Sequence, residues 1–387
     1  MLAMSCFAIQ AVAQFAYGPA RAGEQGLFDG YRTDRTGNFT PLAGSPFLGS
    51  GSLSGMLVSP KNDFLYIYNQ ASDGSLKVLT YHIGKDGYPN PVGSGLLYTP
   101  PQPPAGQFLF TLFSMISGSG RYIYINNTFT DDEGSPNTNQ LSVLHIQKDG
   151  SVTFNPKEIY NFGKIGDGIR MMAGDPAGKF VYGLQYAFQG DDDSIIGATV
   201  ASNGTLTPIP NNKLPADLAS SIAMGPEGKY FYEFIDSNTG GPEQLGVYQV
   251  GRDGSLAPIA GSPFSDAAGH FNIITQPQWH PDGKFAYALG FLPPPNDTGA
   301  VGVYAYKLEG DGQLTPLLGS PFPLGTVDAQ ANNLVVDPKG GFLTVNDVGG
   351  GSDHNWVFEI QSDGSLKERA NSPSPSIPTI DAFVGKE

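Results

Sequence analysis

Arg170 places a permanent positive charge in the segment Ile169-Arg170-Met171-Met172, just ahead of a tight turn at Pro176. A guanidinium stays protonated and pairs well with carboxylates and phosphates, but it cannot transfer a proton. Hydrolysis would need a separate base within hydrogen-bond reach of the attacking water. Of the histidines, only His270 and His354 fall in variable loops. In a hydrolase we expect His270 or a loop carboxylate to supply that base.

Metal-binding patterns are weak in this sequence. The histidines lack the His-Glu-x-x-His and His-x-His spacings of zinc sites, and the single cysteine, Cys6, excludes a zinc site built from cysteines. Two acidic clusters, Asp131-Asp132-Glu133 and Asp191-Asp192-Asp193, supply the carboxylates that Ca²⁺ prefers. Neither has the spacing of an EF-hand loop. We therefore expect solvated charge and no cofactor, and the alternative is a divalent cation held by Asp131, Asp132, Asp191 and Asp192.

Polar residues recur at one position relative to a repeated tight turn. The position lies six residues ahead of the turn proline or its equivalent and is occupied by Ser54, Leu112, Arg170, Ser220, Thr275 and Asn332. Gln185 follows Arg170 by one strand. We predict that the polar members and Gln185 form a hydrated mouth that binds a small polar ligand. The alternative is that these residues are polar because water fills the central channel of a propeller, and that they bind no ligand.

The elements that position these residues belong to one repeat, whose clearest copy is residues 276–321. It contains an apolar lead-in, a tight turn at Pro281-Asp282-Gly283-Lys284, a strand beginning Phe285-Ala286-Tyr287, a second strand at 301–307 and a second tight turn at Asp311-Gly312. A last extended piece follows. These parts predict a four-stranded antiparallel unit with two short turns.

Two markers of the repeat each occur seven times. The second turn carries a glycine after Asp, Asn or Thr, at Gly37, Gly87, Gly150, Gly204, Gly254, Gly312 and Gly364. The strand after the first turn opens with an aromatic-x-Tyr pair at Phe15/Tyr17, Phe64/Tyr66, Tyr122/Tyr124, Phe180/Tyr182, Tyr230/Tyr232 and Phe285/Tyr287, and with Phe342/Thr344 in a weakened copy. A fixed period of this kind indicates a repeat architecture.

Seven four-stranded units predict an all-β fold, a single seven-bladed β-propeller spanning residues 14–387. The first repeat, 14–47, lacks a lead-in strand, and the fuller repeats are 48–106, 107–163, 164–215, 216–267, 268–325 and 326–375. The tail at 377–384 is extended and alternating. We predict that it completes the first blade, because pairing N- and C-terminal strands in one blade removes the open edges of the ring.

The strand order also assigns the two faces of the propeller. If the strands are lettered A to D from the axis outward, the short, repetitive A–B and C–D turns share one face. The longer B–C and D–A loops share the other face and differ in every repeat. Variable loops on a rigid scaffold commonly carry function, so we expect a small polar ligand or a protein partner to bind there.

Composition excludes several classes of protein. The chain has 52 Gly, 32 Pro, 24 Phe and 18 Tyr, which fits short strands joined by many turns. Its net charge of −15 argues against a nucleic-acid partner. No apolar stretch approaches the ~20 residues of a membrane-spanning helix. We expect a monomer without a transmembrane helix.

Residues 1–13 are apolar and end in Ala11-Val12-Ala13, which is typical of the end of a secretory signal. The basic start of such a signal is missing. Three interpretations stay open: a signal that begins upstream of Met1, the first strand of the first blade, or a lipoprotein signal ending at Cys6. The first and third predict an extracytoplasmic protein, periplasmic or secreted, and the second a cytoplasmic one.

The motif P-x-G-K-[FY]-x-Y, followed by a V-x-V-Y-type strand, D-G-x-L-x-P and G-S-P-F, resembles the lactonase family of seven-bladed propellers. That family includes 6-phosphogluconolactonase-like proteins and carboxymuconate-cyclising enzymes. The resemblance covers residues 14–384 and is carried by Asp282 to Phe285, Val301 to Tyr306, Asp311 to Pro316 and Gly319 to Phe322.

The resemblance implies an Arg-His pair, a Glu and a further His in a lactonase site. Arg170 matches the Arg position, Met171 stands at the His position, Gln185-Tyr186 occupies the region of the Glu, and the preceding repeat has no His at 108–116. The sequence therefore favours a binding or scaffold protein that uses the variable loop face. The alternative is a lactone hydrolase acting on a sugar lactone, with Arg170 and His270 in its site.

Overall fold

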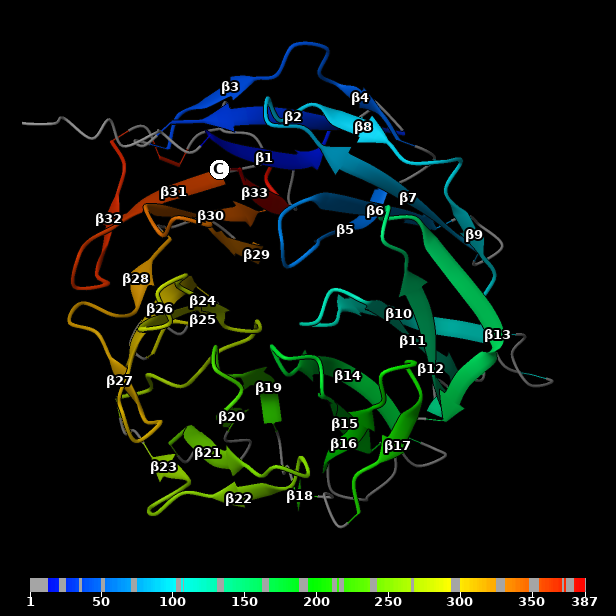
Figure 1. Ribbon diagram of the computed structural model, residues 1–387. Coiled ribbons are helices and arrows are strands. Elements are labelled where there is room, and N and C mark those ends of the chain that lie inside the picture. Colours follow the sequence, from blue (N-terminus) through cyan, green and yellow to red (C-terminus); the bar gives the residue numbers. More distant parts are fainter. Residues whose placement is uncertain are drawn as a thin grey trace, which may run out of the picture.

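The computed structural model describes residues 13–20, 26–34, 37–49, 53–70, 75–101, 106, 108–130, 136–161, 167–187, 194–210, 214–215, 219–236, 242–265, 268–293, 300–324, 331–347, 355–370, 372–373 and 379–386. All regular structure in these segments is β-strand, so none of them forms a helix that could span a membrane. Seven antiparallel sheets surround a central axis and follow the chain around the ring (Figure 1). The predicted all-β, seven-bladed propeller is confirmed.

The strand bounds fall within the predicted repeats except in blade 1, where β1 begins one residue before the predicted start, β4 ends one residue after the predicted end, and the tail strand β33 ends at Lys386 instead of residue 384. Blade 1 contains β1 (Ala13–Pro19), β2 (Leu27–Thr33), β3 (Phe39–Pro41), β4 (Phe47–Leu48) and β33 (Ala382–Lys386). Blade 2 contains β5 (Leu53–Val58), β6 (Phe64–Gln70), β7 (Leu76–Ile83), β8 (Pro89–Pro91) and β9 (Leu96–Tyr98). Blade 3 contains β10 (Phe108–Ile116), β11 (Tyr122–Thr130), β12 (Pro136–Ile146) and β13 (Val152–Asn161). Blade 4 contains β14 (Asp167–Gly174), β15 (Phe180–Ala187), β16 (Ser194–Val200), β17 (Leu206–Pro208) and β18 (Leu214–Pro215).

In the remaining blades, as in blades 2 to 4, the strands run in chain order from the axis outward. Blade 5 contains β19 (Ala219–Met224), β20 (Tyr230–Ile235), β21 (Gln244–Val250), β22 (Leu256–Pro258) and β23 (Phe264–Ser265). Blade 6 contains β24 (Gln278–Trp279), β25 (Phe285–Phe291), β26 (Val301–Leu308), β27 (Leu314–Pro316) and β28 (Phe322–Pro323). Blade 7 contains β29 (Ala331–Val336), β30 (Phe342–Asp347), β31 (Asn355–Ile360) and β32 (Leu366–Glu368).

In five blades the outermost strand is broken into two pieces, as in β3 and β4, which both pair with β2. The Gly-Ser-Pro motif explains the break in three of these blades. Its serine hydroxyl accepts a hydrogen bond from a backbone amide of the third strand, as in Ser262 with Val247 at 2.9 Å and Ser320 with Ala305 at 2.9 Å. The hydroxyl stands in for the missing strand carbonyl, so the buried amide keeps a partner.

The C-terminal strand β33 closes the ring as the innermost strand of blade 1. It pairs antiparallel with β1, from Ala13 opposite Lys386 to Tyr17 opposite Ala382 (Figure 1). The preceding residue Ile380 is held from blade 7, because the side-chain amide of Asn346 donates to its carbonyl at 2.5 Å and accepts from its amide at 3.2 Å. The predicted closure by N- and C-terminal strands is confirmed.

Asp381, within this closure, gives a pH-dependent prediction. Burial raises the pKa of its carboxyl, and the hydrogen bond from Asn333 at 3.2 Å partly opposes that shift. The pKa of this carboxyl in the folded protein thus lies above its unfolded value of about 3.9. The contribution of Asp381 to the free energy of unfolding is therefore fully present below pH ~3.9 and is lost as the pH rises through the folded pKa. Asp381→Asn should therefore melt higher than the parent at neutral pH, with the gap shrinking toward pH ~4. A gap that does not change with pH in thermal melts would contradict this origin.

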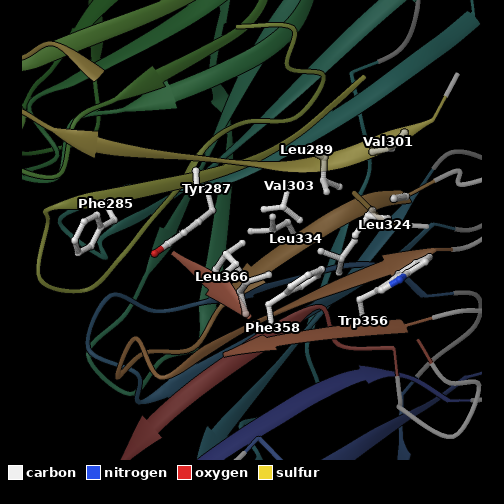
Figure 2. Close-up of a cluster of buried hydrophobic side chains, with 14 residues drawn as sticks. Phe285, Tyr287, Leu289, Val301, Val303, Leu324, Leu334, Trp356, Phe358 and Leu366 are labelled. Carbon is white, nitrogen blue, oxygen red and sulfur yellow. The ribbon is translucent and has the colours of Figure 1, made fainter. Parts of the chain in front are cut away.

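Seven hydrophobic clusters of described residues form the core, one between each pair of adjacent blades. Figure 2 shows the cluster between blades 6 and 7, where Tyr287, Leu289 and Val303 face Leu334, Trp356 and Phe358. Tyr287 and Trp356 are fully buried. Sheets that pack face to face in this way bury alternate side chains of each strand.

The two sequence markers are partners across every blade interface. The first aromatic ring of each pair lies on the second-turn glycine of a neighbouring blade, in the pairs Phe15–Gly87, Phe64–Gly150, Tyr122–Gly204, Phe180–Gly254, Tyr230–Gly312, Phe285–Gly364 and Phe342–Gly37. In four of these interfaces the tyrosine that follows donates to the carbonyl of the same glycine, for example Tyr182 to Gly254 at 2.8 Å. Both markers occur seven times because each of the seven blade interfaces needs one aromatic pair and one glycine.

Candidate functional site

The predicted mouth residues mark irregularities in the innermost strands. The pairing of β14 with β15 skips from Ile169 to Met171, which leaves Arg170 out of the ladder. The same shift leaves out residues 54, 220 and 332 in β5, β19 and β29. A β-bulge of this kind bends its strand and redirects one side chain, and bulges are frequent next to active sites.

Blade 3 departs from the predicted position. Its bulge lies between Leu109 and Thr111, two residues ahead of Leu112. Blade 3 has Ser117-Gly118-Ser119-Gly120 where other blades have a turn proline. In blade 6, Thr275 lies just ahead of β24, where the amides of Ile274 and Thr275 both point to the carbonyl of Leu289, at 2.8 and 3.4 Å.

Arg170 is exposed at the head of β14, on the side of the variable loops. Its neighbour Gln185 is paired with Ile169 in the register but is only 2% exposed, and Ser194 donates to its side-chain oxygen at 3.5 Å. Gln185 therefore lies within the blade, and a ligand could reach it only after a rearrangement. Its predicted part in binding stays a prediction.

Ser220 and Thr275 are engaged with the backbone. The Ser220 hydroxyl donates to the carbonyl of Phe234 at 3.2 Å, and the Thr275 hydroxyl accepts from the amide of Leu289 at 2.9 Å. For Ser54 and Asn332 only the backbone is described. Four of the six predicted ligand residues, Ser54, Arg170, Ser220 and Asn332, thus occupy the same bulge position in four different blades.

Two polar residues beside these positions were not predicted. Gln276 donates from its side-chain nitrogen to the carbonyls of Met172 at 3.1 Å and Ile222 at 3.2 Å, and Ser221 donates to the carbonyl of Thr275 at 3.0 Å. These bonds join the innermost strands of blades 4 and 5 to the lead-in of blade 6. Both residues directly follow predicted positions in the sequence, which was the signal that could have indicated them.

The two residues predicted for catalysis come from different blades. Arg170 lies on the innermost strand of blade 4, whereas His270 lies in the connection into blade 6, beside its third strand. The backbone carbonyl of His270 accepts a hydrogen bond from Tyr306 on β26 at 2.5 Å. His270 is half-buried. This contact ties the backbone of His270 to Tyr306, a residue of the hydrophobic cluster between blades 5 and 6.

The acidic clusters, including Asp131, Asp132, Asp191 and Asp192, lie outside the described residues, as does His354. In the segments that are described, no three His, Cys, Asp or Glu side chains converge to hold a metal ion. Most of the variable loops also fall outside these segments. The prediction of a polar pocket at that mouth therefore stays a prediction.

Solved structures with a similar fold include proteins that are named as lactonases. A candidate 6-phosphogluconolactonase of Bacteroides fragilis is 18% identical, with a TM-score of 0.62 over 93% of this chain and 94% of that one. The periplasmic gluconolactonase PpgL of Pseudomonas aeruginosa is 16% identical, with a TM-score of 0.62 over 97% and 98% of the two chains. A Lactobacillus plantarum protein has 14% identity and a TM-score of 0.64 over 97% and 100%.

No family model and no curated protein sequence matches the chain. The resemblance predicted from the sequence is thus confirmed for the architecture, since the likeness to gluconolactonase-type proteins extends around the whole ring. At these identities it concerns the fold alone. Activity must be argued from the residues of this chain.

Proposed function

We propose that this propeller binds a small polar ligand with an anionic group, at the channel mouth on the face of the B–C and D–A loops, and does not hydrolyse it. The observation that carries this proposal is the set of bulges at residues 54, 170, 220 and 332. They repeat one ladder irregularity at the same end of four innermost strands. Arg170 supplies an exposed positive charge at that end.

The residues around Arg170 support binding better than proton transfer. Met171, at the position that the lactonase resemblance gives to His, accepts a hydrogen bond through Sδ from the amide of Ile222 at 3.4 Å, and its Sδ also lies 3.4 Å from the hydroxyl oxygen of Ser221. A thioether has no proton to give. Gln185, in the region of the Glu, is a buried neutral amide. General acid–base catalysis needs a titratable group in such a place.

Titration calorimetry with 6-phosphogluconate and gluconate tests the binding proposal. Arg170→Gln should weaken binding roughly 10- to 100-fold, because a hydrogen bond to a charged group contributes about 1.5–3 kcal/mol. Arg252→Gln is the matched control, since Arg252 is an exposed arginine in a C–D turn on the opposite face. Equal affinities for the parent and Arg170→Gln would remove the proposed site. Absence of binding to either anion would leave a protein partner on the same loops.

The alternative function is lactone hydrolysis, favoured by the names of the propellers that share this fold. Incubation with gluconolactone and 6-phosphogluconolactone should show no turnover above spontaneous ring opening. If the parent and Arg252→Gln hydrolyse a lactone but Arg170→Gln does not, the protein is a lactone hydrolase and the binding proposal is wrong.

We further propose an extracytoplasmic location. The signal-like end at Ala11-Val12-Ala13 supports it. One propeller of the same fold is named as periplasmic.

A further inference from the structure

A cavity with an unusual charge lies among the short A–B and C–D turns, on the face opposite the B–C and D–A loops. It has a volume of about 600 Å³ and is lined by parts of three blades. The A–B turn and third strand of blade 2, the A–B turn of blade 7 and the end of β33 all contribute. Its charged or titratable lining residues are Lys61, Asp63, His82, Lys85, Lys339 and Lys386.

The lining is strongly cationic although the chain is acidic. Four of the 21 Lys and Arg residues line this one cavity, in a protein of net charge −15. The one carboxylate, Asp63, accepts from the Lys386 ammonium at 3.2 Å, and the Lys386 side chain is only 11% exposed. Among the described residues, Lys61 and Lys85 form no ion pair. The described residues that line the cavity therefore bring four positive charges and one negative charge.

The turn motif does not by itself produce this charge. A cavity of about 190 Å³ between blades 5 and 6 lies on the same face and contains Lys229 and Lys284, but Glu227 and Glu309 balance them. In those two A–B turns the lysine follows the proline by three residues, at Pro226 to Lys229 and Pro281 to Lys284. In blades 2 and 7, which flank the ring closure, a lysine follows the proline directly, at Lys61 and Lys339.

We infer that the lysine cavity of blades 1, 2 and 7 binds a small multivalent anion that bears phosphate or carboxylate groups. Its volume lies within the roughly 300–1,000 Å³ of small-molecule sites. Ammonium groups act as compact point charges that accept phosphate and carboxylate alike. The ligand would contact Lys386 on β33 together with turns of both neighbouring blades, and so bind the folded, closed ring. The site does not depend on the proposed function on the opposite face.

Calorimetry with inorganic pyrophosphate and with citrate, at constant ionic strength, tests this site. The triple variant Lys61→Gln/Lys85→Gln/Lys339→Gln retains the Lys386–Asp63 pair and should bind the tighter anion at least roughly 100-fold more weakly. The anion should also raise the melting temperature of the parent but not of the variant, because a ligand that binds only the folded state stabilises it. The tighter of the two anions identifies the chemistry of the ligand.

The matched control is Lys229→Gln/Lys284→Gln, which removes lysines from the balanced cavity on the same face. It should bind as the parent does. Equal losses in the control and the triple variant would show attraction by surface charge alone and overturn the inference. Absence of binding by both anions to the parent would also overturn it. Circular dichroism of each variant shows that the fold is retained.

Discussion

Deletion of residues 379–387 is expected to lower the melting temperature by more than about 10 °C and to make the protein associate. The deletion removes β33 and with it three large apolar side chains that are buried, Ile380, Phe383 and Val384. Each contributes about 1.5–3 kcal/mol when fully buried. Their sum is comparable with the ~5–15 kcal/mol that stabilises a typical folded protein.

The loss is larger than this sum because the tail also fills a structural position. Without β33, the inner edge of β1 loses its partner, and an unpaired edge is a template for association with other chains. Phe383 also packs on Phe39 and Phe342, so blades 1 and 7 lose a shared ring contact. Thermal melts and size-exclusion chromatography measure both effects. A truncated chain that stays monomeric and melts within about 2 °C of the parent would disprove the closing role.

Two further experiments separate closure from a general loss of hydrophobic surface. Phe383→Ala should cost about 3–5 kcal/mol, whereas Leu318→Ala, at a side chain that is 96% exposed, should cost almost nothing. A synthetic peptide of residues 379–387, added to the truncated chain, should restore part of the lost melting temperature by strand addition. A peptide with Phe383→Asp serves as its control.

The fold could be predicted because the repeated residues are the ones that make contacts between blades. Phe180 and Tyr182 of one blade contact Gly254 of the next blade. If one repeat lacked the glycine, the aromatic side chain of the neighbouring repeat would lose its packing contact. The weakened copy, Phe342/Thr344, follows the same rule. Phe342 still faces Gly37, but the threonine in place of tyrosine cannot reach a distant carbonyl.

The candidate site could be predicted only in part. Counting from the turn selected residues 54, 170, 220 and 332 as the heads of inner strands, and the structure shows a bulge at each of them that the sequence did not predict. In blade 3 the count selected Leu112, but the bulge is nearer to Leu109 than to Leu112. The lysine cavity was missed because its residues come from three blades. Nothing in a linear pattern shows that Lys61 and Lys339 face one space.

Gly87→Ala is expected to destabilise the protein by about 2–5 kcal/mol, a large effect for the addition of one methyl group. Gly87 has a φ of 83°, and a Cβ there would lie 2.1 Å from the ring of Phe15. The left-handed backbone costs a side chain about 1–2 kcal/mol, and forced overpacking of a buried ring adds about 1–3 kcal/mol. Phe15 is fully buried in the cluster between blades 1 and 2, so its ring can move only by displacing packed neighbours. Denaturant unfolding measures the change as a lower midpoint at an unchanged slope.

Gly93→Ala is the control that isolates the ring contact. Gly93 has a φ of 63°, also in the left-handed region, but a Cβ there meets nothing within 4 Å. It should therefore show only the backbone cost of about 1–2 kcal/mol.

Tyr17→Phe tests the other half of the contact, because the Tyr17 hydroxyl donates to the Gly87 carbonyl at 2.5 Å and its loss leaves a buried acceptor without that partner. A double-mutant cycle tests whether the aromatic pair and the glycine form one coupled contact between the blades. In that case the losses of unfolding free energy in Gly87→Ala and Tyr17→Phe will be less than additive, because the turn displaced by Gly87→Ala has already weakened the hydrogen bond of the Tyr17 hydroxyl. Equal destabilisation by Gly87→Ala and Gly93→Ala would instead assign the glycine marker to turn geometry alone.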